Sequence, residues 1–312
     1  MWPTASRPVD RHTLIQAARQ LRQGLNRQLT RARFQLLHWE HLPRHPRVQL
    51  TCAGRTDGGG AQWLSTVSVL AFAGAYRIPF AHTPFQVIEH GSGDSGAWLE
   101  AWNSLFNLQA CGIPQAPSCA HQLSCHNLLQ AHRSLARHPG EPGVWALRHA
   151  HQFSNLYPTR LASLRSLLRQ AYRPRSQLAP PPQPLDRTLV VHVRRGDVQA
   201  SGPHQHRFTS ATTIAARCRR IQIRYPHLRQ VLLLSASPDA DLLCLCDQGF
   251  ALDASHDVFS HFHWMSQAAG LVMARSALSY LAAMLNPHLV FYDRFEHPPL
   301  PGWIRLPRGR SQ

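Results

Sequence analysis

The sequence contains no lysine, so all 33 of its basic residues are arginines. Only 16 acidic residues oppose them, which gives the 312-residue chain a net charge of +17. Codon bias toward GC produces such an arginine excess as readily as selection for a ligand does, and the charge by itself indicates anionic partners in general. These include phosphorylated small molecules, acidic lipid surfaces and nucleic acid. Because no nucleic-acid-binding module and no row of aromatic platforms is recognisable, we expect no nucleic-acid partner.

Long apolar runs are also lacking. No stretch approaches the length of a membrane span, and the first residues, MWPTASRPVDRHTLIQ, lack the apolar core of a secretory signal. The seven cysteines are an odd number without a repeating spacing, which favours reduced thiols over a disulfide framework. The sequence therefore predicts a cytoplasmic protein. The candidate metal ligands of the middle region follow no zinc-site spacing, and no metal is expected there: Cys111, Cys119, His121, Cys125 and His126.

The most informative stretch is TLVVHVRRGD, residues 188–197. Its β-branched apolar run is typical of a strand buried on both faces of a parallel sheet, and Gly196 ends it. His192, Arg194, Arg195 and Asp197 then lie at the carboxyl end of the strand, where open α/β sheets bind ligands. An arginine there presents a rigid fork of N–H donors that matches phosphate oxygens. A solvated rim of paired charges is the alternative interpretation of the same residues.

The second half of the chain alternates strands with helices, which predicts a doubly wound parallel sheet. The proline-rich segment 174–185, with PPPQP at its centre, is incompatible with the interior of a helix or strand and is interpreted as a linker. It divides the chain into an α/β domain at 1–173 and a second at 186–312. The elements expected in the second domain are strands at 188–193, 230–235, 249–252, 270–274 and 288–292, and helices at 210–224, 238–246, 257–269 and 276–285.

In the first domain, strand 48–53 runs into a glycine loop and then into a helix of small residues. Gly58, Gly59 and Gly60, followed by Gln62, form the part of the loop that can expose backbone N–H groups to an anion. The loop is neither a Walker A loop nor a full GxGxxG fingerprint. The further expectations are strands at 78–82 and 144–147 and helices at 97–108 and 158–172.

A helix is also predicted at 10–40, with an apolar stripe and an arginine-rich opposite face. The basic face is either simply solvated or makes peripheral contact with a membrane surface.

Two strand ends of the second domain carry serines in front of helices. Ser235 closes one strand, and Arg275, Ser276 and Ser279 surround the start of the helix at 276–285. A serine in this place is most often an N-cap. It can equally donate its hydroxyl, beside the free helix N–H groups, to a phosphate.

Together these residues resemble a known family. HVRRGD is similar to the HxRRxD motif of the fucosyltransferases that form α1,2 and α1,6 linkages and of the protein O-fucosyltransferases. The loop GGGAQ with AHTPFQVIEH, and the late stretch DVFSHFHWMSQAAGLVMARSALSYLAAMLNP, resemble further parts of the family in the expected order. The resemblance covers about half of the chain and implies two Rossmann-like domains facing a cleft, as in the GT-B architecture or a variant of it.

The resemblance also implies an activity, namely inverting transfer of fucose from GDP-fucose without a metal or other cofactor. Arg195 would grip the β-phosphate, while His192 and Asp197 would contact the nucleotide or order the arginine. His261, with Asp257 one helical turn earlier, stands where the family usually has an acid that pairs with guanine, so the sequence leaves the nucleotide open. The implied donor-binding set is His192, Arg194, Asp197, Ser235, Asp257, His261, Arg275, Ser276 and Ser279.

An inverting transfer wants a base for the acceptor hydroxyl, and Asp57, Glu89 and Asp197 are the candidates. The acceptor would be a glycan or a lipid-linked glycan, contacted by residues 85–145. Three other functions remain compatible with the sequence: the same fold with another nucleotide-diphosphate sugar, an inactive relative that only binds nucleotide, and a non-enzymatic protein that binds polyanions.

Overall fold

The computed structural model describes residues 48–89, 95–117, 143–254 and 258–307, the backbone of 123–125, and residues 25, 29 and 32. Leu25, Leu29 and Ala32 are helical, but the rest of the helix expected at 10–40 lies outside the described residues. So do Asp257 and most of the Cys/His group at 119–126.

The first half is built on a parallel sheet in the order β1-β3-β2, from Val48–Cys52, Gly143–Leu147 and Leu123–Cys125. The strand expected at 78–82 is present only as isolated bridges from Phe80 and His82. Two helices and a 3-10 turn connect these strands: α2 (Gly59–Tyr76), α3 (Ser95–Asn103) and η2 (Gln109–Cys111).

Three short helices follow β3: α5 (His151–Leu156), α6 (Pro158–Ala162) and α7 (Arg165–Ala171). The prediction of a single helix at 158–172 is therefore wrong, because the helix is interrupted between α6 and α7. Residues 173–184, which cover most of the expected linker, contain no helix or strand. The backbone of Ala179 ties them to the second half, since its N–H donates to Ser260 Oγ and its carbonyl accepts from Trp264 Nε1.

The second half contains a six-stranded parallel sheet in the order β6-β5-β4-β7-β8-β9. The chain starts at the central strand β4, winds outward through β5 and β6, and then crosses to β7, β8 and β9. This is the doubly wound order, with its switch point between β4 and β7. The strands are β4 (Thr188–His192), β5 (Gln230–Leu234), β6 (Ala251–Asp253), β7 (Gly270–Val272), β8 (Leu289–Tyr292) and β9 (Ile304–Arg305).

The helices of this half agree with the expected alternation of strands and helices. They are η3 (Leu185–Arg187), η4 (Gln205–Arg207), α8 (Ala211–Arg224), α9 (Ala240–Leu243), η5 (Cys246–Gln248), α10 (Val258–Gln267) and α11 (Ala277–Leu285). The predicted fold class, two α/β units facing a cleft with a doubly wound second sheet, is confirmed. The helix expected at 238–246 is shorter than predicted, and β9 had no signal in the sequence.

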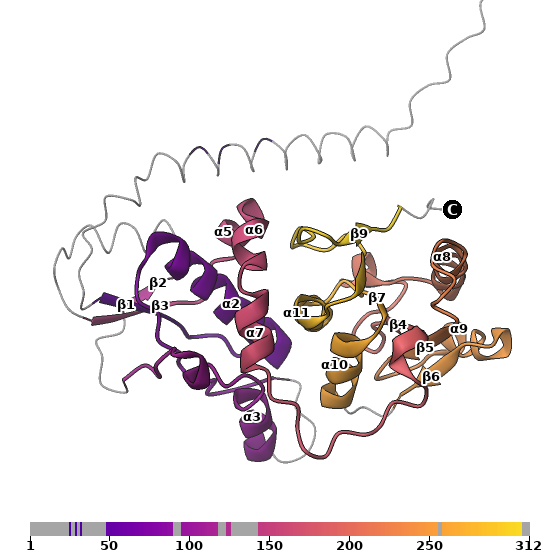
Figure 1. Ribbon diagram of the computed structural model, residues 1–312, viewed down its shortest axis with the longest axis horizontal. Coiled ribbons are helices and arrows are strands. Elements are labelled where there is room, and N and C mark those ends of the chain that lie inside the picture. The colour runs from indigo at the N-terminus through magenta and orange to yellow at the C-terminus, as the bar shows by residue number, and fades with distance from the viewer. Residues whose placement is uncertain are drawn as a thin grey trace, which may run out of the picture.

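The two halves pack directly on each other. Figure 1 shows α11 at the boundary, facing α2 and α7 of the first half. One cluster of buried apolar side chains runs through both halves. Arg165 and Arg169 of α7 also reach across the boundary, where they donate to the last carbonyls of α11 at Met284, Leu285 and Asn286. These guanidinium groups satisfy carbonyls that a helix end leaves unpaired.

The start of α2 is shaped by two close approaches. A Cβ on Gly59 would collide with the ring of Trp102, and a Cβ on Gly60 would lie 2.9 Å from the Cα of Leu278 in α11. Both glycines therefore allow helix packing, whatever else the loop does. Among the described residues, no helix is long and apolar enough to cross a membrane.

We expect Gly60→Ala to lower the free energy of unfolding by about 1–3 kcal/mol, because its Cβ has to push α2 away from the backbone of α11. Gly74→Ala in the same helix is the matched control, since nothing lies within 4 Å of its added Cβ. That substitution should stabilise by roughly 0.5–1 kcal/mol. Urea unfolding of both variants measures the difference; equal effects would contradict the packing role of Gly60.

Candidate functional site

The two halves enclose a cleft of about 840 Å³ at the carboxyl end of β4. The first half contributes the glycine loop, part of α5 and the indole rings of Trp98 and Trp102. The second half contributes the segment after β4, the start of α11 and the loop after β8. The cleft therefore lies beside the topological switch point, where a doubly wound sheet binds its ligands.

Arg195 borders this cleft, but its guanidinium does not face it freely. The side chain is 2% exposed, and its Nε lies 2.7 Å from Asp239 Oδ2. Nη2 donates to the carbonyl of Thr209 and to Asp241 Oδ2, and Nη1 donates to the carbonyl of Arg194. Three hydrogen bonds and two carboxylates thus engage the guanidinium in this structure, so its fork is not free to receive a diphosphate.

The two carboxylates that hold Arg195 also cap helices. Asp239 accepts from the backbone N–H of Leu242 as the N-cap of α9, and Asp241 accepts from the N–H of Ala211 at the start of α8. The guanidinium also stacks over Phe208, with its carbon 4.3 Å from the ring centre. Arg195 thus joins the segment after β4 to two helix ends, which is a structural role.

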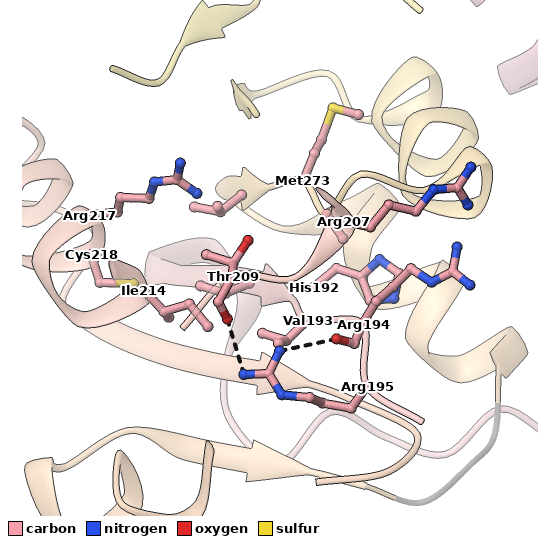
Figure 2. A pocket seen from close by; sticks show the side chains of 13 residues that line it. His192, Val193, Arg194, Arg195, Arg207, Thr209, Ile214, Arg217, Cys218 and Met273 are labelled. Atoms are coloured by element: carbon pink, nitrogen blue, oxygen red, sulfur yellow. Dashed lines mark hydrogen bonds between the residues drawn. The ribbon is translucent and has the colours of Figure 1, made fainter. Parts of the chain in front are cut away.

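Arg194 faces the other way. Figure 2 shows Arg194 and Arg207 extending to one side of the end of β4, with the guanidinium of Arg195 on the other. Both Arg194 and Arg207 line the cleft. Arg194 forms an ion pair with the half-exposed Asp197, and Arg207 lies 3.6 Å from Glu296. Burial, and then the charge of Arg207, lower the pKa of Arg194, so an anion between the two would relieve their repulsion.

Helix ends add further donors. Gly58, Gly59 and Gly60 at the start of α2 line the cleft together with Ser276, Ala277 and Leu278 at the start of α11. Ser276 is the N-cap of α11, but its side chain makes no capping hydrogen bond. Its hydroxyl is thus available beside free backbone N–H groups, an arrangement that favours anions.

Three other predicted donor-binding residues do not line the cleft. Ser279 is fully buried, and its Oγ accepts from the N–H of Ala274. Arg275 forms an ion pair with Asp293 and donates to the carbonyl of His206, which fixes the segment after β4. Ser235 is 1% exposed and its hydroxyl makes no hydrogen bond. None of the three is part of the cleft wall.

His192 lines the cleft, and His261 lies close to it but is not part of the cleft wall. Burial, then the charges of Arg194 and His261, lower the pKa of His192 to about 3, and its Nδ1 has no hydrogen-bond partner among the described residues. It is therefore neutral at physiological pH. His261 Nε2 lies 2.7 Å from Asp253 Oδ1 at the end of β6. The carboxylate beside His261 thus comes from a strand.

In the first half, Asp57 and Glu89 both line the cleft. Asp57 is paired with Arg55, and Glu89 accepts from Thr56 Oγ1 at 2.6 Å. Gln62 does not reach the cleft, because its amide donates to the carbonyls of Asp57 and Val87 and fastens the loop. Among the described residues, no group of three or more His, Cys, Asp or Glu side chains is arranged to hold a metal ion.

Among known proteins, only solved structures match this chain, by their fold. No protein-family model matches the sequence, and no curated protein matches it. In fold the chain is similar to POFUT1. The structure of POFUT1 in complex with GDP has a TM-score of 0.47 and 13% identity, over 83% of this chain and 97% of that chain.

Two bacterial structures are similar as well. Fucosyltransferase NodZ from Bradyrhizobium has a TM-score of 0.38 and 14% identity, over 77% of this chain and 94% of its own. The E. coli heptosyltransferase WaaC with ADP-2-deoxy-2-fluoro heptose has 0.37 and 10%, over 83% and 92%. With identities this low and TM-scores below 0.5, these similarities assign no function, which has to come from the site itself.

Sequence reasoning missed several residues of the cleft, among them Asn155, Arg207, Glu296 and His297. Arg207 lies in a segment with no regular pattern, and Asn155 and His297 are brought together across 142 positions. No local signal in the sequence could have paired them.

The two adjacent arginines should differ in what they stabilise. We expect Arg195→Ala to lower the free energy of unfolding by about 2–4 kcal/mol, because it leaves two carboxylates and two carbonyls without their buried partner. Arg194→Ala removes a partly exposed pair and should cost less than about 1 kcal/mol. Chemical denaturation compares them. If the Arg195→Ala protein kept its stability but no longer bound nucleotide, Arg195 would be a ligand-binding residue and not a structural one.

Proposed function

We propose that this chain is a glycosyltransferase that moves a sugar from a nucleotide diphosphate to an acceptor hydroxyl in the cleft. The proposal rests on one observation: Arg194, Arg207, Ser276 and the start of α11 converge on one cleft beside the switch point of a doubly wound sheet. Guanidinium forks and free helix N–H groups are the donors that a diphosphate needs.

Arg194 is the residue to which we assign the leaving group. Transfer passes through an oxocarbenium-like state in which negative charge grows on the β-phosphate. A fixed guanidinium aimed at that charge stabilises the transition state more than the ground state. Arg194 suits this role, because its carboxylate partner Asp197 is 54% exposed and Arg194 itself lines the cleft. Arg207 supplies a second positive charge from the same wall.

The finer parts of the proposal come from the sequence motif. HVRRGD and the late serine-bearing stretch support GDP-fucose as the donor, inversion at the sugar carbon, and a reaction without metal, in which the two arginines neutralise the diphosphate. The acceptor is proposed to be a glycan or a lipid-linked glycan in the cytoplasm. A second candidate, another nucleotide-diphosphate sugar, is favoured by one observation: His261 replaces the acid that would pair with guanine, and Asp253 lies behind it.

Calorimetry with GDP, UDP and ADP, and with their sugars, separates these candidates. We expect saturable binding of GDP and GDP-fucose, unchanged by EDTA. Tighter binding of UDP or ADP would keep the enzyme class and replace the donor. Equal binding of all polyanions with a steep salt dependence would overturn the proposal in favour of a polyanion-binding protein. Binding of GDP-fucose without turnover would indicate a relative that only binds nucleotide.

We expect Arg194→Ala to reduce the rate of GDP release from GDP-fucose by about 10²- to 10⁴-fold, as for loss of a main electrostatic stabiliser. Arg194→Lys should restore only part of the rate, because an ammonium cannot form the two-pronged contact. Arg220→Ala is the matched control: this arginine is exposed on α8 away from the cleft, and its removal changes the net charge equally. Similar rates in the Arg194→Ala and Arg220→Ala proteins would contradict the assignment.

A further inference from the structure

The cleft contains a histidine that the sequence did not single out. His297 lies in the loop after β8, is 7% exposed and forms part of the cleft wall. Its Nδ1 lies 2.9 Å from Oδ1 of Asn155, at the end of α5 in the first half. The pair therefore joins the two halves of the protein at the edge of the proposed reaction site.

The hydrogen bonds determine which nitrogen of His297 carries the proton. Asn155 uses its amide nitrogen to donate to the carbonyl of Glu296, so the oxygen of the amide faces His297. An amide oxygen can only accept, and Nδ1 must therefore be the donor. In a neutral imidazole the other nitrogen, Nε2, then keeps its lone pair. Orientation of a histidine through Nδ1 is the device by which proteins prepare a general base.

The surroundings keep this imidazole neutral and fixed. Burial, followed by the charges of His149 and Arg55, lowers the pKa of His297 to about 4. Its ring packs 4.5 Å from that of His151 and 5.6 Å from that of Tyr280, measured between centres. The charged neighbours from other elements are Arg55 of the glycine loop, Glu296 beside it and Arg207, which pairs with Glu296.

The three carboxylates expected to act as the base are all engaged. Asp57 is paired with Arg55, and Asp197 with Arg194. Each of these two carboxylates already has a guanidinium as its partner. Glu89 accepts a short hydrogen bond from Thr56. His297, in contrast, has a lone pair that no hydrogen bond among the described residues uses.

We propose that His297 is the general base for the acceptor hydroxyl and that Asn155 is its positioning residue. This inference rests on the proposed transfer reaction and names a residue within it. The acceptor oxygen forms a bond to the anomeric carbon as the bond from that carbon to the diphosphate oxygen breaks, and the bonding electrons leave with the diphosphate. The hydroxyl proton passes to Nε2, and the imidazolium then returns it to water.

Arg207 places this base near the leaving group. It shares the cleft wall with Arg194, and its partner Glu296 directly precedes His297 in the chain. A diphosphate held by the two arginines brings negative charge toward the imidazole. That charge raises the pKa of His297 above its value in the empty cleft, which makes it a stronger base when donor is bound.

The test uses the full chain, with GDP-fucose as donor and water as acceptor. His297→Gln keeps a polar side chain but no basic nitrogen, and we expect GDP release to fall by about 10²- to 10³-fold. The dissociation constant for GDP should change less than about threefold, since the base does not hold the nucleotide. His288→Gln is the matched control, because His288 is an exposed histidine outside the cleft. GDP release within threefold of wild type in His297→Gln would overturn the inference.

Asn155→Asp distinguishes a general base from a purely structural histidine, because only a base would shift the pH profile of GDP release. GDP release should decline as pH falls through the pKa of the base. A carboxylate beside Nδ1–H favours the imidazolium and raises that pKa, so the decline should begin about one pH unit higher than in wild type. An unchanged pH profile would overturn the inference even if His297→Gln failed to fold. Absence of both GDP binding and turnover in the wild-type protein would instead overturn the proposed function.

Discussion

The arrangement of the site depends on how closely α2 approaches α11. Gly60 lies against the backbone of Leu278, and Gly59 lies against the ring of Trp102. Because both helices begin at this contact, their N-terminal ends open into the same space. A side chain at Gly60 would separate these two helices and, with them, the carboxyl edges of the two sheets. The cleft thus depends on the close backbone packing at this glycine, which sets the position of its polar groups.

The arginine pair after β4 shows how one strand end serves both structure and ligand. Neighbouring residues of an extended chain point in opposite directions, so Arg194 and Arg195 cannot share a role. One side meets Asp239 and Asp241 at the starts of two helices, and the other meets the open cleft. The buried arginine makes the segment rigid, and this rigidity gives its neighbour a fixed direction without many contacts of its own.

The sequence predicted the features that depend on neighbouring residues in the chain. The alternation of strands and helices in the second half, the strand that ends at His192, the glycine loop and Ser276 all follow from periodicity or turn chemistry. The choice between Arg194 and Arg195 could not be predicted, because the carboxylates that decide it lie more than forty positions away. The same holds for the pair Asn155–His297 and for the break between α6 and α7. The strand expected at 78–82 is reduced to isolated bridges at Phe80 and His82, because an apolar run does not specify which strand it pairs with.

The two arginines of α7 that cap α11 hold the two halves of the protein together. Four hydrogen bonds and a continuous apolar core would have to be broken before one half could rotate away from the other. Large hinge bending is therefore costly in this fold. In the proposed transfer, the width of the opening between the two halves would select the acceptor, without closure of the halves around it.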